Sequence, residues 1–207
     1  MELKDALSQH VEMTKVVFRE MDWADADVYA NWLSQTYYFV SHTTRLLALA
    51  AGTALLNEQN YHEQFLYHLK EEAGHEKLAL NDLKALEKEV SPELSSTKQF
   101  YFKEYQLIRE VGPIGLFGYM MYLENLAVYA GPGIYEAATK VHGKKAGRFL
   151  AVHINEDVEH VEVTLKTLNS IKQTDKDLIC SHIEISSENY RNILKQISAS
   201  PKAQGVA

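Results

Sequence analysis

The sequence is poor in cysteine: Cys180 is the single thiol among 207 residues. One thiol cannot build a disulfide framework, and it cannot supply the thiolate set of a structural zinc site. This excludes the disulfide-stapled secreted class of protein. Low cysteine usage also favours a reducing compartment, so the predicted location is the cytoplasm.

The chain also lacks an excess of basic residues, because 21 Lys and Arg face 28 Asp and Glu and give a formal net charge of −7. A nucleic-acid-binding surface needs a basic stripe, so no nucleic-acid partner is expected. The N-terminal MELKDALSQH has no apolar region of a signal peptide. The most apolar segment, 114–130, carries Glu124 and is shorter than the roughly 20 residues of a membrane span. No membrane partner is predicted.

No stretch alternates convincingly as a strand, and almost every segment has a helical period. With 46% hydrophobic residues, the length suits one domain with a sizeable core. We therefore predict an all-α, single-domain bundle of seven to eight helices over residues 1–198, with a frayed C-terminal tail over 199–207. The expected helices are 3–20, 28–57, 60–89, one from Ser91-Pro92 to Gly112, 114–130 closed by Gly131-Pro132-Gly133, a short one to His142, 144–168, and one after Thr174.

Three polar residues share one face of the predicted helix 144–168, within HINEDVEH. At about 100° per residue, Asp157 lies about 40° round from His153, and His160 lies about 20° to the other side. This face should point towards the core. Imidazoles and a carboxylate are costly to bury unless something satisfies them, and a metal ion commonly does so.

Two further predicted helices carry ligand-type residues on apolar faces. Glu72 and His75 lie one turn apart in 60–89, and His68 shares their face. Glu124 is the only charged residue between Val111 and Tyr135. Leaving that carboxylate ionised and unpartnered in a core would cost several kcal/mol.

Together the three helices offer carboxylates and imidazoles without a thiolate, which suits iron or manganese better than structural zinc. Other interpretations stay open at this point. His68 fits a hydrogen-bonded core histidine equally well, and Glu124 could pair with Arg45 or Arg148. Asp82, one heptad beyond His75, could orient a histidine or lie at the rim.

Ferritin-like di-iron bundles draw a single Glu from each of two helices and a Glu-x2-His from each of the other two. That pattern fails here because no acidic residue lies between Val28 and Asn57, while His153 is additional. The order of HLKEEAGHEKLALNDL, GYMMYLENLA and HINEDVEH instead resembles the heme-oxygenase-like di-iron oxidases. These are also called iron-containing redox enzymes and are related to the TENA/THI-4 proteins.

The resemblance implies a heme-oxygenase-like bundle and an oxidoreductase that uses O2 as co-substrate. Such an enzyme oxidises a small metabolite by attack on a C–H or N–H bond. Two Fe(II) ions are expected, the second of them labile, with iron or manganese left open. A small-molecule substrate is predicted, and a homodimer is compatible with the resemblance. The implied ligands are Glu72, His75, the bridging Glu124, His153, Asp157 and His160, with His68 as a further candidate because some relatives have Glu there.

Three other functions remain open on the same fold. A metal-free TENA/THI-4-type enzyme would hydrolyse a thiamin-like pyrimidine with a pocket Cys or an acidic pair. Cys180 lies outside the three predicted helices that carry the ligand-type residues. A heme protein would use His10 as its proximal ligand and would leave Glu124 without a purpose. A non-catalytic binding protein would hold the polar residues as a salt-bridged core network.

Overall fold

The computed structural model describes residues 2–168 and 171–199, without the side chains of 158–160, 162–163 and 165–167. Over these residues the secondary structure is helical with no strand, so the all-α prediction is confirmed. The predicted tail beyond residue 199 lies outside the described residues. The α-helices are α1 (Leu3–Glu20), α2 (Ala26–Thr53), α3 (Gln59–Glu71), α4 (Glu76–Ala85), α5 (Ser95–Glu110), α6 (Leu116–His142), α7 (Arg148–Leu168) and α8 (Gln173–Ala199), with short 3-10 turns at Leu56–Glu58 and Lys144–Ala146.

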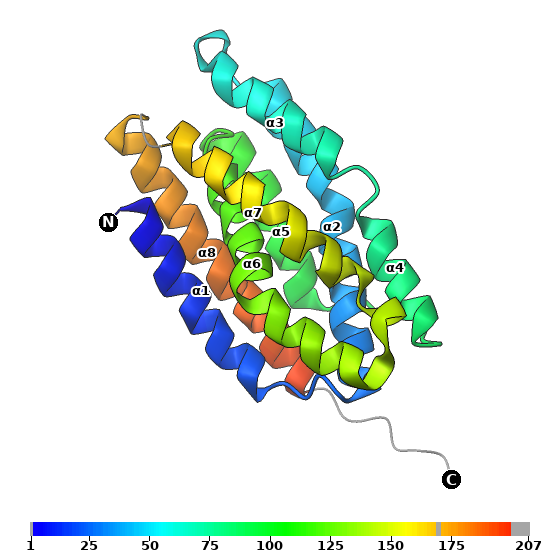
Figure 1. Ribbon diagram of the computed structural model, residues 1–207. Coiled ribbons are helices and arrows are strands. Elements are labelled where there is room, and N and C mark those ends of the chain that lie inside the picture. Colours follow the sequence, from blue (N-terminus) through cyan, green and yellow to red (C-terminus); the bar gives the residue numbers. More distant parts are fainter. Residues whose placement is uncertain (1, 169–170, 200–207) are drawn as a thin grey trace.

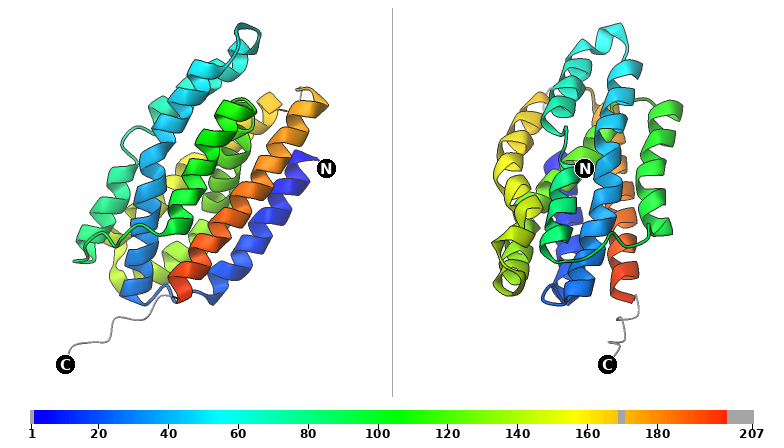
Figure 2. Two further views of the ribbon diagram at one scale, coloured as in Figure 1. Left: turned by 180° about the vertical axis from the view of Figure 1, so that it is seen from behind. Right: turned by 90° about the vertical axis from the view of Figure 1, so that its right-hand side faces the viewer.

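The helices lie side by side in an elongated bundle (Figures 1 and 2). α6 packs along α7 and α8, and α1 lies against α8 and α6. α2 packs against α3, α4 and α5. The segments that carry the predicted ligands meet in the interior of the bundle, between α2 on one side and α6 and α7 on the other.

The segment predicted as one helix over 60–89 is two helices with a turn between them. α3 ends at Glu71 and α4 begins at Glu76. Gly74 in this turn has a φ of +99°, a conformation that glycine adopts without the steric cost other residues incur. The prediction of a continuous helix is therefore wrong. Glu72 and His75 lie on the turn itself and not on a helical face.

The predicted helix start at Ser91-Pro92 is also wrong, because α5 begins at Ser95. The segment before α5 is tied to α2 instead. The backbone N–H of Ser91 donates to Ser34 Oγ at 3.0 Å, and the Pro92 carbonyl accepts from Gln35 at 3.1 Å. Side chains of α2 thus form hydrogen bonds with backbone N–H and carbonyl groups that would otherwise be bonded within a helix.

The predicted stop at Gly131-Pro132-Gly133 is wrong as well, since α6 continues through Pro132 to His142. The expected short helix to His142 is the end of α6. Packing explains the glycine, because a Cβ on Gly131 would lie 2.8 Å from the Ile154 side chain. Close approach of α6 to α7 outweighs the helix-breaking tendency of the motif.

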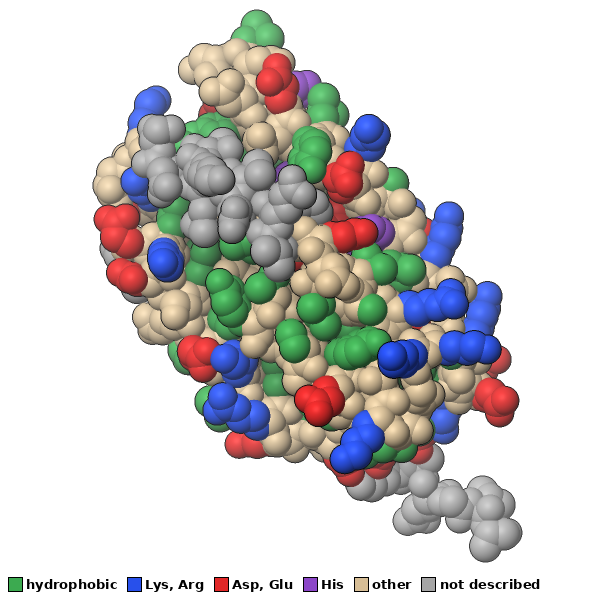
Figure 3. Space-filling model, in the orientation of Figure 1, with side chains coloured by type: hydrophobic (Ala, Val, Ile, Leu, Met, Phe, Trp, Pro, Cys, Tyr) green, Lys and Arg blue, Asp and Glu red, His purple; other side chains and the backbone are tan. Residues whose placement is uncertain are grey.

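The surface carries charges of both signs. On the face of Figure 3, acidic and basic side chains are interspersed, with the basic ones gathered towards the right-hand edge, and hydrophobic side chains lie between them. Among the described helices, none combines the length and the apolar character that a membrane span requires.

Candidate metal centre

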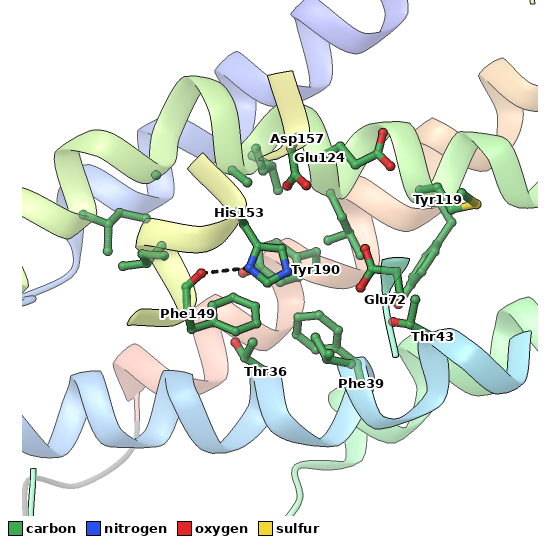
Figure 4. Close-up of a pocket in the computed structure, with 18 of the residues that line it drawn as sticks. Thr36, Phe39, Thr43, Glu72, Tyr119, Glu124, Phe149, His153, Asp157 and Tyr190 are labelled. Carbon is green, nitrogen blue, oxygen red and sulfur yellow. Dashed lines mark hydrogen bonds between the residues drawn. The ribbon is translucent and has the colours of Figure 1, made fainter. Parts of the chain in front are cut away.

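A partly open pocket lies between α2, α6 and α7 (Figure 4). Its wall is mostly apolar, and Phe39 and Phe149 are two of the rings that form it. Four of the predicted ligands line it: Glu72, Glu124, His153 and Asp157. The turn between α3 and α4 therefore meets α6 and α7 at one place in the bundle.

Glu72, His75 and His153 each offer a ligand atom, and these atoms lie within 4.8 Å of one another. His75 Nδ1 is 3.3 Å from Glu72 Oε2, and the His75 and His153 rings are 4.9 Å apart in an edge-on arrangement. The Glu72 carboxylate raises the pKa of His75, although burial of the ring opposes this. Such a cluster of two imidazoles and a carboxylate can hold one divalent ion.

His153 is held in a defined orientation. Its Nδ1–H donates to the Phe149 carbonyl at 2.8 Å (Figure 4). A carbonyl only accepts, so the proton must be on Nδ1. Nε2 is then the ring nitrogen available to a metal, which is the arrangement seen when a backbone carbonyl fixes a metal-binding histidine.

Asp82 of α4 supports this arrangement from a distance. Its carboxylate accepts the backbone N–H groups of Arg148 at 3.1 Å and Phe149 at 2.9 Å, and so caps the first turn of α7. Its burial raises the pKa of Asp82 to about 6, although these hydrogen bonds act in the opposite direction. Asp82 is fully buried rather than at the rim, and it positions the helix that carries His153.

Glu124 is buried in α6, and its Oε2 has no hydrogen-bond partner among the described residues. Its Oε1 lies 3.6 Å from His68 Nδ1. Burial raises the pKa of Glu124 well above its ordinary value, and the nearby Asp157 and Glu72 carboxylates add to this. Within the described chain, no ion pair joins Glu124 to Arg45 or Arg148. A buried carboxylate with one unpartnered oxygen beside two other carboxylates is suited to binding a cation.

The remaining predicted ligands occupy different positions. Asp157 is buried on α7 and lines the pocket. His68 is buried in α3 and contacts Glu124, but it is not among the residues that line the pocket. His160 belongs to α7, and its side chain lies outside the described residues.

The structure adds pocket residues that the sequence did not single out. α2 brings no carboxylate to the described lining of the pocket, but Thr36 and Thr43 line it, as do Trp32, Tyr119 and Tyr190. Thr36 and Thr43 are seven residues apart on one helical face. In the sequence, the signal that could have identified these two pocket residues was the repetition of polar side chains at this spacing on an apolar helical face.

The residues required by the alternative functions lie elsewhere. Cys180 is a half-buried cysteine of α8, and it is not one of the described residues that line the pocket. His10 is buried on α1 with its Nδ1 2.7 Å from Ser187 Oγ, and it does not line the pocket either.

Solved structures share this architecture. A protein of unknown function with a heme oxygenase-like fold from Shewanella denitrificans matches with a TM-score of 0.85 at 21% identity, over 96% of this chain and 92% of its own. A TenA homologue from Pseudomonas syringae pv. tomato matches with a TM-score of 0.76 at 11% identity, over 96% and 91%. A TenA homologue from Pyrococcus furiosus matches with a TM-score of 0.69 at 13% identity, over 94% and 99%.

No protein-family model and no curated protein sequence matches this chain. The structural similarities therefore establish the fold, which is heme oxygenase-like, as the sequence resemblance implied.

Proposed function

We propose that this protein is a non-heme di-iron or iron–manganese oxidase that activates O2 to oxidise a small metabolite. The observation that supports this most directly is the convergence of Glu72, His75 and His153, whose ligand atoms lie within 4.8 Å of one another. Buried Glu124 and Asp157 line the same pocket.

The charge of the buried residues favours a site that holds two metal ions over a polar core without metal. Glu72, Glu124 and Asp157 bring three carboxylates to one pocket, and burying them without a cation would cost several kcal/mol. Two divalent ions carry four positive charges against these three negative ones. Oxygen and imidazole donors without a thiolate favour iron or manganese. When bound, such a pair supplies the electrons and the open coordination positions for reduction of O2.

The side chains of this protein have separate tasks in this proposal. His153 presents Nε2 because Phe149 holds Nδ1–H, and Asp82 fixes the start of the same helix. The Glu72 and His75 side chains keep 14% and 15% exposure, so this end of the site contacts solvent. The apolar wall of the pocket limits the water that reaches the reacting groups.

The test is anaerobic loading with Fe(II), followed by iron counting and Mössbauer spectroscopy. About two irons per chain are expected for a di-iron site. Glu124→Ala and His160→Ala should each lose iron, while the exposed Glu71→Gln should retain it. Failure of the intact protein to take up iron or manganese would end this proposal.

A second candidate function is a metal-free hydrolase acting on a thiamin-like pyrimidine, supported by the structural similarity to the two TenA homologues. Cys180 is not among the described residues lining the pocket, so the acidic residues Glu72 and Glu124 would take the acid–base role. Pyrimidine hydrolysis in the presence of a chelator, lost in Glu72→Gln and kept in Cys180→Ala, would favour this function.

A further inference from the structure

We propose that a basic surface at the connection between α6 and α7 binds a small acidic electron-transfer protein, and that a chain of packed rings leads electrons from this surface to His153. The purpose of the electrons rests on the proposed oxidase function. The docking itself rests on the charge and the packing of this part of the molecule.

The basic surface comes from a stretch of sequence without acidic residues. No Asp or Glu lies between Glu136 and Glu156, although the whole protein has a formal net charge of −7. Four basic residues fall within this stretch, and all of them are exposed: Lys140, Lys144, Lys145 and Arg148. These four residues are called the basic surface below. They make this part of the molecule positive in an acidic protein.

The fold brings these four residues together at one end of the bundle. Lys140 lies in the last turn of α6, Lys144 and Lys145 lie in the 3-10 turn that follows, and Arg148 begins α7. The 3-10 turn packs against α4 and α6. The connection lies at the edge of the molecule where Figure 3 shows basic side chains gathered (compare Figure 1). None of the four forms an ion pair with another described residue, so their charge is available to a partner.

A chain of rings joins the basic surface to the candidate metal centre. The half-buried His142 of the same connection stacks on Tyr29 with ring centroids 5.7 Å apart, and Tyr29 stacks on Trp32 at 5.8 Å. The rings of Trp32 and Phe149 are 6.1 Å apart, and those of Phe149 and His153 are 4.2 Å apart. Electron tunnelling slows steeply with distance and across gaps between atoms. A continuous series of packed rings is therefore a suitable route for electrons.

The route is short, and it is fixed to the basic surface. Arg148 and His153 are five residues apart on α7, which is about 8 Å along the helix axis. The Tyr29 hydroxyl donates to the Ala146 carbonyl at 2.8 Å and so bonds α2 to the 3-10 turn between α6 and α7. The solvent-exposed end of the site, at Glu72, belongs to the turn between α3 and α4 instead. A protein bound at the basic surface thus leaves that end open to small molecules.

An acidic electron carrier is the partner whose chemistry fits this surface. A pair of Fe(III) ions left after O2 reduction needs two electrons to return to Fe(II). Two reduced carriers each lose one electron and each Fe(III) gains one, so no atom or proton is transferred. A protein is too large to enter the pocket and must deliver its electrons through the surface. Positive charge on one partner and negative charge on the other steer such an encounter.

The first experiment measures binding of an oxidised, acidic plant-type [2Fe–2S] ferredoxin to the purified full-length protein by calorimetry. Ferredoxin should bind with the same affinity to the iron-loaded and the metal-free protein. Raising NaCl from about 20 mM to about 200 mM should weaken binding about tenfold or more, because the attraction is electrostatic. Absence of binding at low salt, or an affinity independent of salt, would overturn the inference. Tighter binding of duplex DNA or of phosphatidylserine vesicles than of ferredoxin would also overturn it.

Charge reversal then locates the docking site. Lys144→Glu combined with Lys145→Glu should weaken ferredoxin binding about tenfold or more. Lys4→Glu combined with Lys172→Glu is the matched control, because it changes the net charge equally at exposed positions near the opposite end of the bundle (Figure 1). Equal losses in the two proteins would contradict this placement. A dimer of the parent protein that the first pair dissociates in sedimentation would assign the surface to a second copy of the chain and overturn the inference.

The route is tested by the rate at which reduced ferredoxin is oxidised by the Fe(III)-loaded protein, followed by absorbance. His142→Ala removes the first ring and should slow this oxidation severalfold without changing the affinity for ferredoxin. Val141→Ala, at the adjacent exposed position, should change neither. Reduced methyl viologen, a small cation that is not attracted to the basic surface, should react equally fast with all three proteins. An unchanged rate with ferredoxin in His142→Ala would contradict the route.

The two proposals fail separately. Ferredoxin binding by a protein that takes up no iron would end the oxidase proposal and support the docking surface. Iron uptake without ferredoxin binding would support the oxidase proposal and end the docking surface.

Discussion

The buried carboxylate of Asp82 accepts the backbone N–H of Phe149 at 2.9 Å and thereby caps α7 from a different helix. The carbonyl of the same Phe149 accepts the Nδ1–H of His153 at 2.8 Å. One residue of α7 thus links a remote carboxylate to an imidazole of the candidate metal centre. This short chain of hydrogen bonds contributes to the position of α7 and to the orientation of His153.

Removing the cap should loosen both the fold and the site. Asp82→Ala leaves two backbone N–H groups at the start of α7 without their acceptor, which should lower the free energy of unfolding by about 1–3 kcal/mol. Fe(II) affinity should fall by about tenfold as His153 loses its support. Urea unfolding and anaerobic iron titration measure the two effects. Asn81→Ala, at the adjacent exposed position, should change neither.

The pKa of Asp82 predicts a dependence of stability on pH. Burial raises this pKa from 3.8 to about 6, so the folded protein holds the proton more tightly than the unfolded chain. The resulting stability is present below about pH 4 and is lost as the pH rises through about 6. Asp82→Asn cannot ionise and should escape this loss.

The measurement is urea unfolding of both proteins between pH 4 and pH 7. Relative to Asp82→Asn, the parent protein should lose on the order of 3 kcal/mol across this range. An unchanged difference between the two proteins would show that Asp82 does not titrate there.

Much of the site could be predicted from the sequence because its residues are unusual for their surroundings. Glu124 is the single charge in a long apolar segment, and His153 and Asp157 interrupt an apolar face. Each of these departures from the surrounding apolar pattern involves neighbouring residues only, so it can be recognised in a single sequence. All three side chains line the pocket.

The remaining features depend on contacts between distant segments. The break between α3 and α4 follows from the left-handed conformation of Gly74, which the helical period of the neighbouring residues conceals. Continuation of α6 through Pro132 depends on the packing of Gly131 against Ile154 of α7. The cap at Asp82 joins positions 66 and 67 residues apart. Propensity and period carry no information about these pairings.

Glu124→Gln should have opposite effects on the metal-free and the metal-loaded protein. Burial raises the pKa of Glu124, so the stability that this group contributes at low pH is lost as the pH rises. Without metal at pH 8, the amide should make the protein more stable than its parent. With Fe(II), the parent should gain more stability than the variant, because the variant has lost a ligand.

Thermal unfolding with and without anaerobic Fe(II) tests this reversal. Glu156→Gln is the control, since Glu156 is about half exposed and lies 3.8 Å from His75 without lining the pocket. The control should behave like the parent in both conditions. A variant that is less stable than its parent without metal would mean that Glu124 has a structural partner.

Gly74 sets the geometry of the turn that presents Glu72 and His75, so a side chain there should disturb the site. Its φ of +99° is unfavourable for any residue with a Cβ, although no atom lies within 4 Å of the position a Cβ would occupy. Gly74→Ala should therefore lower the free energy of unfolding by about 1–2 kcal/mol through backbone strain alone.

Gly52→Ala is the matched control for this strain. Gly52 also has open space around it, but it lies in the last turn of α2 without a positive φ. Alanine there should stabilise the protein by about 0.5–1 kcal/mol. In Gly74→Ala the relaxing turn should also move Glu72 and His75 apart and weaken Fe(II) binding, whereas Gly52→Ala should bind iron as the parent does. Equal iron affinity in both variants, measured by anaerobic titration, would mean that the turn does not set the spacing of these two ligands.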